Sequence, residues 1–502
     1  MRKKFFIFGI AILILSILSY YNLKTSVLFP ILCVSLLFIG FLNSIQHKHA
    51  ILRNFPVLGY FRYFFEMIAP EIQQYFIERT TDGKPFSRNE RSLVYQRAKN
   101  IDATTPFGTQ LDINQSNYEG IKHSIFPAKV NDDMPRVTIG GPDCKQPYSA
   151  SILNISAMSF GSLSENAIVA LNKGAKKGEF YHNTGEGGLT EFHLQGGDIT
   201  WQIGTGYFGC RTKEGNFDAD KFVDKSNKPE VKMIEIKLSQ GAKPGHGGVL
   251  PASKNTEQIA KIRGVEPHTT ILSPPSHTAF NNPSGLIQFV AQLRSLSNGK
   301  PIGFKLCIGQ SSEFEAICHE MIVQHCFPDF ITVDGAEGGT GAAPLEFSDG
   351  VGMPFEPALI FVNKTLINLG IRDKIRVIGS GKIISGYSIL RAIAMGADLC
   401  NSARGFMFSL GCIQALRCNN NACPTGVATQ DKMLMKGLVV TDKAERVYYF
   451  HKNTLHAANE LLAAAGKTAY SEVDNSIFMR GDEFTKLSDL YFPDNLTSVS
   501  QL

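Results

Sequence analysis

The sequence predicts an α/β protein built on a (β/α)8 TIM barrel, with a transmembrane hairpin before the barrel and a helical extension after it. Three observations support this prediction. Two uncharged apolar runs lie within the first 43 residues. From Ile152 onward, short apolar segments alternate with longer amphipathic stretches. Residues suited to chemistry follow the ends of these short segments, which is where barrels of this type carry their active sites.

The composition is that of a packed globular protein. Apolar residues make up 43% and charged residues 19% of the 502 residues, which excludes a disordered or fibrous chain. The net charge of +5 includes no long basic run, so no nucleic-acid partner is expected. Ten cysteines in a chain of this length do not indicate a disulfide scaffold.

The two apolar runs, residues 5–21 and 26–43, are each close to the length that a helix needs to cross a bilayer. A cleaved signal peptide is the alternative, because residues 2–4 are basic, but the second run favours a hairpin over residues 1–48. Basic residues flank both outer ends, whereas the connector holds only Lys24. We therefore expect an anchor in the inner (cytoplasmic) membrane and a catalytic domain in the reducing cytoplasm.

The rest of the chain is expected to form a helical and irregular cap over 49–150, the barrel over 151–430 and a helical extension over 431–502. Eight strands separated by helical stretches over roughly 250 residues are typical of the barrel. No Gly-x-Gly-x-x-Gly motif opens a strand–turn–helix unit, so a dinucleotide-binding fold is not expected. The expected strands are 151–157, 178–183, 232–237, 269–273, 301–307, 329–334, 375–379 and 397–401.

The turns after the last two expected strands predict a phosphate site. Gly379, Ser380, Gly381 and Lys382 follow the seventh strand, and Arg404 follows the eighth. Glycines let backbone N–H groups approach phosphate oxygens, and the following helix offers its positive end. A Gly-Ser-Gly-Lys turn is also found as a plain turn; its position in the strand order favours the phosphate site.

A group of basic residues predicts a site for a dicarboxylate. Lys237, Gln240 and Lys243 lie around the third expected strand, and Arg263 lies on the next helix. Converging lysines and an arginine bind carboxylates by charge-assisted hydrogen bonds. Solvated surface charges are the alternative, but the glycine-rich neighbours favour close approach of a ligand. Glu186 would add a substrate contact or an acid–base group.

Cys412, Cys418 and Cys423 form the one cluster of cysteines, which we call the cysteine loop (residues 412–423). Thiolates hold the iron of iron–sulfur clusters, and three close cysteines suit a 3Fe-4S cluster or a cubane with one foreign ligand. Zinc with a distant fourth ligand and plain buried thiols are the alternatives.

In their order along the chain, these motifs resemble the FMN-binding synthase domain of glutamate synthase, including its stand-alone forms. The resemblance covers roughly residues 110–480. It implies a stand-alone, membrane-anchored member of the large-subunit family, with FMN on the barrel and a 3Fe-4S cluster on the three cysteines. The matching motifs are Ser156–Ser164, Asn183–Gly188, Gln240–Gly245, Ser273–His277, Gly338–Ala342 and Cys412–Gln430.

The resemblance also implies roles for single residues. The 2-oxoglutarate contacts fall on Glu186, Lys237, Gln240, Lys243 and Arg263. Glu186, Lys243 and Lys305 are the expected catalytic residues, with Lys305 stabilising the anionic reduced flavin. Ser380 and Lys382 of the expected phosphate site join the flavin contacts, which fall on Ser156, Ala157, Met158, Ser159, Asn183, Lys305, Gly338, Gly339, Gly379, Gly381, Ser402, Ala403, Arg404 and Gly405.

The implied function is an oxidoreductase acting on CH–NH2 donors. It would aminate 2-oxoglutarate reductively to L-glutamate, with electrons entering through the cluster. No segment resembles the amino-terminal glutaminase or the carboxyl-terminal glycine-repeat domain of the family. The expected partners are therefore an ammonia source, with a separate glutaminase subunit as one form of it, and an electron-donor protein such as a ferredoxin or an NAD(P)H-oxidising subunit.

Two departures from the family pattern keep other functions open. His246 stands where relatives commonly have Glu, and Val249 where they have Gln. A second reading is thus an FMN and iron–sulfur enzyme acting on another amine or keto acid, similar to N-methylglutamate synthase. A third is a non-catalytic membrane subunit for electron transfer or regulation; the intact lysines and Glu186 count against it.

Overall fold

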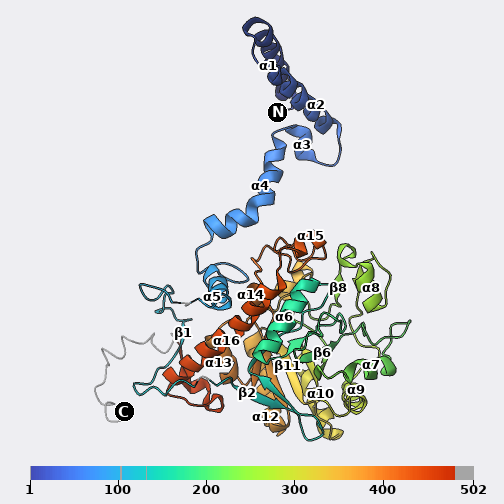
Figure 1. The fold of residues 1–502 in the computed structure, drawn as a ribbon, viewed down its shortest axis with the longest axis vertical. Coiled ribbons are helices and arrows are strands. Elements are labelled where there is room, and N and C mark those ends of the chain that lie inside the picture. Colours follow the sequence, from blue (N-terminus) through green and yellow to red (C-terminus); the bar gives the residue numbers. More distant parts are fainter. Residues whose placement is uncertain (1, 102–103, 132, 481–502) are drawn as a thin grey trace. The chain divides into compact units, whose positions relative to one another are not determined.

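The computed structural model describes residues 2–101, 104–131 and 133–480 (Figure 1). The chain divides into two compact units, Met1–Pro85 and Phe86–Leu502. Residues 481–502 of the expected helical extension lie outside the described part of the chain.

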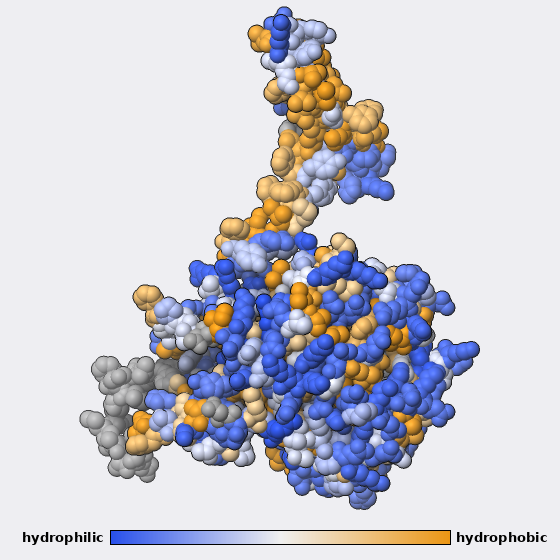
Figure 2. Space-filling model, viewed as in Figure 1, coloured by the Kyte–Doolittle hydropathy of each residue, from blue (hydrophilic) through white to orange (hydrophobic). Residues whose placement is uncertain are grey.

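The first unit is helical. Helices α1 and α2 are long and apolar enough to cross a membrane, by length and composition only, and a signal sequence near the amino terminus passes the same test. Figure 2 shows the apolar side chains of this pair. The two helices pack closely at Gly40, because a Cβ there would lie 2.2 Å from a ring carbon of Phe5. The helices are α1 (Arg2–Leu23), α2 (Leu28–Ile45), α3 (Ala50–Asn54), α4 (Gly59–Ile72) and the π-helical η1 (Gln73–Ile77).

The second unit is built on a closed barrel of eight strands in the order β10-β11-β12-β13-β4-β5-β6-β7. All neighbouring pairs are parallel, which confirms the predicted fold class. The barrel strands are β4 (Leu153–Ile155), β5 (His182–Asn183), β6 (Ile199–Ile203), β7 (Val231–Lys237), β10 (Ile302–Leu306), β11 (Phe330–Asp334), β12 (Arg376–Ser380) and β13 (Leu399–Ser402).

One of the eight expected strands was wrong. The segment expected over 269–273 contains β9 (Ile271–Leu272), which pairs antiparallel with β8 (Val249–Leu250) outside the barrel. The strand that was missed is β6. Its polar residues Thr200 and Gln202 alternate with apolar ones, yet all five residues are buried, because both faces of a barrel strand are covered. The strand that ends at Lys237 is therefore the fourth barrel strand along the chain and not the third. The strand that contains Lys305 is the fifth, as expected.

Helices cover the outside of the barrel. Helix α6 begins at the N-cap Ser164, whose side chain accepts a hydrogen bond from the N–H of Ala167. The long helix α16 packs against α6, α5 and α13. The helices of this unit are α5 (Arg88–Ala98), α6 (Glu165–Gly178), α7 (Ala219–Ser226), α8 (Glu257–Arg263), α9 (Pro283–Leu296), α10 (Ser311–Val323), α11 (Leu345–Gly350), α12 (Phe355–Asn368), α13 (Gly386–Ala394), α14 (Arg404–Ser409), α15 (Lys432–Met435) and α16 (Val440–Ala464).

Short elements complete the second unit. The segment expected as a helical and irregular cap contains three strands as well as helices. Strand β2 (Arg136–Ile139) pairs with β3 (Tyr148–Ser151), and β1 (Glu119–Ile121) pairs with β14 (Phe478–Arg480). The 3-10 turns are η2 (Ala252–Lys254), η3 (Arg372–Lys374), η4 (Tyr470–Glu472) and η5 (Asn475–Ile477).

Candidate active site

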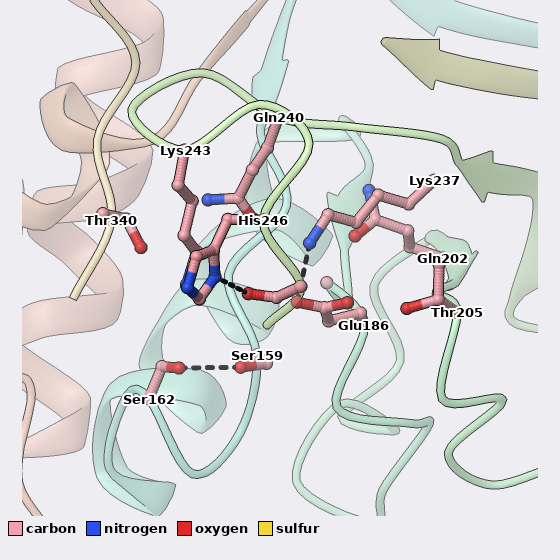
Figure 3. Close-up of polar contacts among 12 residues, drawn as sticks. Ser159, Ser162, Glu186, Gln202, Thr205, Lys237, Gln240, Lys243, His246 and Thr340 are labelled. Atoms are coloured by element: carbon pink, nitrogen blue, oxygen red, sulfur yellow. Dashed lines mark hydrogen bonds and ion pairs between the residues drawn. The ribbon is translucent and has the colours of Figure 1, made fainter. Parts of the chain in front are cut away.

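A cleft opens at the carboxyl end of β7, around a buried ion pair. Lys237 is the last residue of β7, and its Nζ lies 2.6 Å from Oε1 of Glu186 in the loop after β5 (Figure 3). Barrel enzymes bind their substrates at this end of the strands. The cleft is open to solvent on one side and spans about 280 Å³, part of which is solvent space. It is lined by Glu186, Thr205, Lys237, Leu238, Ser239, Gln240, Gly245, His246, Gly247, Gly248, Pro274 and Pro275.

Positively charged side chains outnumber negatively charged ones around Glu186. Burial alone would raise the pKa of Glu186, but Lys237, Lys243 and Arg263 outweigh it and hold the pKa below its usual value. Burial lowers the pKa of Lys237. Burial and the charge of Lys237 lower that of Lys243 to about 8. One carboxylate thus stands among three cations, so the site favours an anionic ligand.

Two glycines leave room for the Glu186 carboxylate. A Cβ at Gly204 would lie 2.5 Å from its Oε2, and a Cβ at Gly248 would lie 2.5 Å from its Oε1. Cβ atoms do not come this close to other atoms in real structures. Any larger residue at either position would therefore displace the carboxylate. The glycines after β6 and before β8 therefore leave the space that the Glu186 carboxylate occupies.

The structure brings together only part of the expected substrate-binding set. Glu186, Lys237 and Gln240 line the cleft. Lys243 is outside this lining, and its Nζ donates to the carbonyl of Ala342 at 2.8 Å. Arg263 is also outside it, and its Nη2 donates to the carbonyl of Phe160 at 3.1 Å. Both act on Glu186 through their charge.

Of the two residues that depart from the family pattern, one lies at the cleft. His246 lines it and contacts the carbonyl of Gly247 through Nδ1 at 2.9 Å. Val249 is on β8 and does not belong to the lining.

A second polar chain runs across the strand ends beside the cleft. Lys305 on β10 lies 3.1 Å from Oδ2 of Asp334, the last residue of β11. Asp334 accepts a hydrogen bond from Ser380 at 3.1 Å, and the hydroxyl of Ser380 lies 3.4 Å from that of Ser156. Burial alone would lower the pKa of Lys305, but Asp334 and Glu235 raise it, so the ammonium stays charged. Three expected cofactor residues thus meet through Asp334.

Asp334 is one of three polar residues of this region that the sequence analysis missed as site residues. Another is Glu235, buried inside the barrel, which accepts hydrogen bonds from Asn183, Gln202 and Thr332 at 2.8, 2.5 and 2.7 Å. The third is Gln202, on the missed strand β6. Glu235 lies two residues before Lys237 on the same strand, which places both side chains on one face of the strand. This spacing could have indicated Glu235 as a site residue.

The loops expected to bind the phosphate converge on one ring. The Arg404 guanidinium lies 4.8 Å and the Lys382 ammonium 5.8 Å from the centre of the Phe86 ring. Arg404 also donates to the carbonyl of Glu337 at 2.7 Å, and a Cβ at Gly339 would lie 3.0 Å from its Cδ. A cationic group beside a bare glycine backbone fits an anionic phosphate.

The other expected cofactor residues lie in the same loops. Ser159 donates to the hydroxyl of Ser162 at 2.9 Å, and Ser402 donates to the carbonyl of Ile383 at 2.5 Å. Gly338 packs against Gly241, where the two backbones approach closely. Ala157 and Met158 follow β4, Gly379 and Gly381 lie at the end of β12, and Ala403 and Gly405 flank Arg404.

The side chains of the cysteine loop are not arranged to hold a single metal ion. Within residues 2–101, 104–131 and 133–480, no group of three or more His, Cys, Asp or Glu side chains could hold a metal ion as the side chains lie. The three thiols nevertheless act on one another electrostatically. Burial would raise the pKa of Cys423, but hydrogen bonds from Thr425 and from the backbone of Ala428 and Val427 lower it. Donors aimed at a sulfur fit a thiolate that ligates an iron–sulfur cluster.

Three parts of the second unit hold the cysteine loop in place. From α5, Tyr95 donates to the carbonyl of Cys412 at 2.6 Å. At the start of the unit, the backbone of Phe86 exchanges hydrogen bonds with the side chain of Gln414 at 3.2 and 3.1 Å. On the other side, Lys254 donates to the carbonyl of Cys418 at 3.3 Å.

Comparison with known proteins identifies the family. Residues 118–468 match the family described as the conserved region in glutamate synthase. The chain belongs to the glutamate synthase family. The match covers the whole barrel and the cysteine loop, and it confirms the resemblance seen in the sequence. The chain is accordingly an oxidoreductase of the glutamate synthase type, which acts on CH–NH2 donors.

Relatives within the glutamate synthase family differ in how much of their length the chain spans. The glutamate synthase large subunit-like protein YerD of Bacillus subtilis (strain 168) is 39% identical over an alignment of 464 positions, which covers 84% of this chain and 88% of that protein. The archaeal glutamate synthase (NADPH) of Methanocaldococcus jannaschii is 35% identical over 314 residues, which are 62% of this chain and 58% of that protein. The chain thus spans little more than half of the archaeal relative.

Proposed function

We propose that this chain aminates 2-oxoglutarate reductively to L-glutamate. The reaction joins one 2-oxoglutarate, one ammonia, two electrons and two protons, and it yields one L-glutamate and one water. The observation that carries the proposal is the surplus of buried positive charge around Glu186 at the carboxyl end of the barrel, in a chain of the glutamate synthase family. A small dicarboxylate supplies the anionic charge that this surplus lacks.

The basic residues would bind and orient the keto acid. Lys237 and the amide of Gln240 line the cleft and would donate hydrogen bonds to the carboxylates. Lys243 and Arg263, outside the lining, would attract the carboxylates through their charge. Lys237 and Glu186 are themselves buried, which strengthens the interaction of Lys237 with an anion placed beside it. Fixing both ends of the substrate fixes the position of its carbonyl carbon.

Glu186 would handle the proton at the nitrogen. Its carboxylate stays ionised beside Lys237, so it can accept a proton from the ammonia that adds to the carbonyl carbon. Once Glu186 has passed that proton on, its restored negative charge would stabilise the positively charged imine of the substrate. Lys243, whose pKa is about 8, is the nearby group best suited to return a proton to the leaving oxygen.

We propose that the chain binds FMN and a 3Fe-4S cluster. When bound, FMN would supply the hydride and a 3Fe-4S cluster the single electrons that the reaction needs. Lys305, Ser156 and Ser380 would hold the flavin ring, and Gly339 with Arg404 its phosphate. Cys412, Cys418 and Cys423 would hold the cluster. The lowered pKa of Cys423 and the glycine beside Arg404 support this assignment.

We further propose that residues 1–48 anchor the protein in the cytoplasmic membrane, with the catalytic unit in the cytoplasm. The two apolar helices support this proposal. An electron-donor protein and a separate source of ammonia, such as a glutaminase subunit, would complete the system. If the hairpin is an anchor, the full chain keeps its amino terminus and resists extraction from membranes by alkaline carbonate; a shortened, soluble chain would mean a signal sequence.

His246 favours a second candidate, a reaction with an amine other than ammonia. The imidazole lines the cleft beside Glu186, where relatives commonly carry a carboxylate. Without a carboxylate there, the site has one acceptor fewer for the N–H groups of an ammonium ion. A methylated amine has one N–H group fewer to satisfy and fits such a site better.

Anaerobic reoxidation tests the proposed function. The purified full chain, reduced without oxygen, is mixed with 2-oxoglutarate and either ammonium, glutamine or methylamine. Flavin reoxidation with ammonium, with glutamate as the product, supports the proposal. Reoxidation only with methylamine supports the second candidate, and no flavin absorbance or no reoxidation contradicts both.

A further inference from the structure

We propose that Lys254 is a positioning residue that ties the cysteine loop to the turn after β4 and sets the reduction potential of the cluster held there. The inference rests on the proposed function, because it assumes that the three cysteines hold an iron–sulfur cluster. It assigns a role to a residue outside the substrate cleft and outside the three thiols.

Lys254 joins two segments that carry different cofactor residues. Its side chain is buried, and its Nζ donates to the carbonyl of Ser162 at 2.5 Å. The same Nζ donates to the carbonyls of Cys418 at 3.3 Å and Ala428 at 3.2 Å. Ser162 belongs to the turn after β4, which carries the candidate flavin contacts, whereas Cys418 and Ala428 lie on either side of Cys423.

The same short region also reaches the substrate cradle. Lys254 ends η2 just before α8, and Arg263 is the last residue of α8. Arg263 donates to the carbonyl of Phe160, two residues from the carbonyl that Lys254 contacts. The segment from η2 to the end of α8 therefore presents two cations to the turn after β4, Arg263 on the side of the substrate cradle and Lys254 on the side of the cysteine loop.

What distinguishes Lys254 from a structural lysine such as Lys300 is that the groups that could balance its charge belong to the cysteine loop. Its three hydrogen bonds go to neutral carbonyls. Among the described groups that act on its charge, the acidic ones are Cys418 and Cys423. A buried ammonium without a carboxylate is costly unless another anion lies nearby. A cluster ligated by thiolates supplies that negative charge.

The charge has a consequence for electron transfer. A thiolate-ligated cluster becomes more negative by one charge when it is reduced, so a fixed cation nearby favours the reduced state. Removal of the charge, with the side chain's bulk retained, should therefore lower the reduction potential. We expect at least a tenfold change in the one-electron equilibrium constant, which corresponds to about 59 mV.

The test compares Lys254→Met, Lys254→Gln and Lys254→Arg in the full-length protein with its cluster reconstituted. The readouts are the cluster potential by EPR-monitored titration and the iron content per chain. Lys300→Met is the matched control, because Lys300 is also buried and donates to three carbonyls, those of Ser226, Lys228 and Val231, at 2.6, 3.1 and 2.6 Å. Its partners lie outside the cysteine loop and the turn after β4.

We expect Lys254→Met to lower the reduction potential of the cluster by about 59 mV or more, which is a tenfold change in the equilibrium constant. Lys254→Arg and Lys300→Met should keep the wild-type potential. If Lys254→Met does not retain iron, loading of Lys254→Arg but not of Lys254→Gln still supports the requirement for charge. An intact cluster with unchanged potential in Lys254→Met overturns the inference, as does equal loss of iron in the Arg and Gln variants. Absence of a cluster from the wild-type protein would instead contradict the proposed function.

Discussion

The Nζ of Lys237 lies 2.6 Å from Oε1 of Glu186, and the two side chains are only 9% and 17% exposed. The same distance separates Lys177 from Glu445, but there the side chains are 45% and 48% exposed. Exposed pairs add little stability, because water screens them and flexible side chains must be ordered. Breaking a buried pair leaves a charge without compensation, so the two pairs should respond differently to the same substitution.

We predict that Lys237→Met destabilises the second unit by about 3 kcal/mol, because Glu186 then loses its hydrogen-bonded partner and keeps only the charges of Lys243 and Arg263. Urea unfolding of the full chain in detergent measures this change. Lys177→Met is the control and should be close to neutral. The double variant Lys237→Met/Glu186→Gln should recover part of the loss, and a double variant no more stable than Lys237→Met would contradict the account.

Lys243 gives the candidate site a pH dependence. Its pKa is lowered to about 8 by burial and by the charge of Lys237, so the ammonium is present at pH 7 and is lost as the pH rises above about 8. Affinity for 2-oxoglutarate should then fall by up to about tenfold per pH unit. Calorimetric titration at pH 7 and pH 9 measures the change. Lys243→Arg should keep its affinity at pH 9; a wild-type affinity unchanged between the two values would rule out this role.

Four buried histidines should make the second unit sensitive to acid. Burial lowers the pKa of His182 and His451 to about 3, that of His277 to about 4, and that of His193 far below its usual value. Below pH 6.5 these histidines are therefore protonated in the unfolded chain but stay neutral in the folded chain. The stability that these neutral histidines contribute is complete above pH 6.5 and is lost as the pH falls toward 4.

The expected loss is roughly 1.4 kcal/mol per histidine for each pH unit within that window. Urea unfolding at pH 7, 6 and 5 gives the slope, and His277→Gln should reduce it by one proton. A free energy of unfolding that is constant from pH 6.5 to 5 would contradict the burial of these rings.

Sequence patterns were sufficient for the barrel but not for every strand. Most strands combined an apolar run with a chemically distinctive end, such as Lys237 or the segment after Asp334, and these were predicted. Strand β6 was missed because Thr200 and Gln202 face the polar inside of the barrel, where Gln202 bonds to Glu235. The pattern of such a strand resembles that of a loop or a half-exposed strand.

The candidate site was partly predictable for a similar reason. Lysines beside glycines indicated an anion site from the sequence alone, and Glu186 was assigned to the same cavity. The roles of Glu235 and Asp334 were not predictable, because they depend on partners far away in the chain, such as Thr332 for Glu235 and Ser380 for Asp334. The direction of the Lys243 and Arg263 side chains also depends on the fold.

Tyr95 provides a test of the cysteine loop. Its hydroxyl donates to the carbonyl of Cys412 at 2.6 Å, so Tyr95→Phe removes one of the contacts that fix this end of the loop. We expect lower iron content per chain and faster cluster loss under a chelator. Tyr148→Phe is the control, since its hydroxyl bonds to Asp198 at 2.9 Å, outside the cysteine loop. Equal cluster loss in both variants would show that the loop does not depend on Tyr95.

The central claim, that this chain makes glutamate at the Lys237–Glu186 cleft, is tested most directly by a single turnover with labelled nitrogen. Anaerobically reduced full-length protein is mixed with 2-oxoglutarate and 15N-ammonium, and the product is measured by mass spectrometry. We predict one 15N-glutamate for each reduced flavin in the wild-type protein and a loss of at least a hundredfold in rate for Glu186→Gln, the order expected when an acid–base group is removed. No labelled glutamate from the wild type, or equal rates for the variant, would contradict the claim.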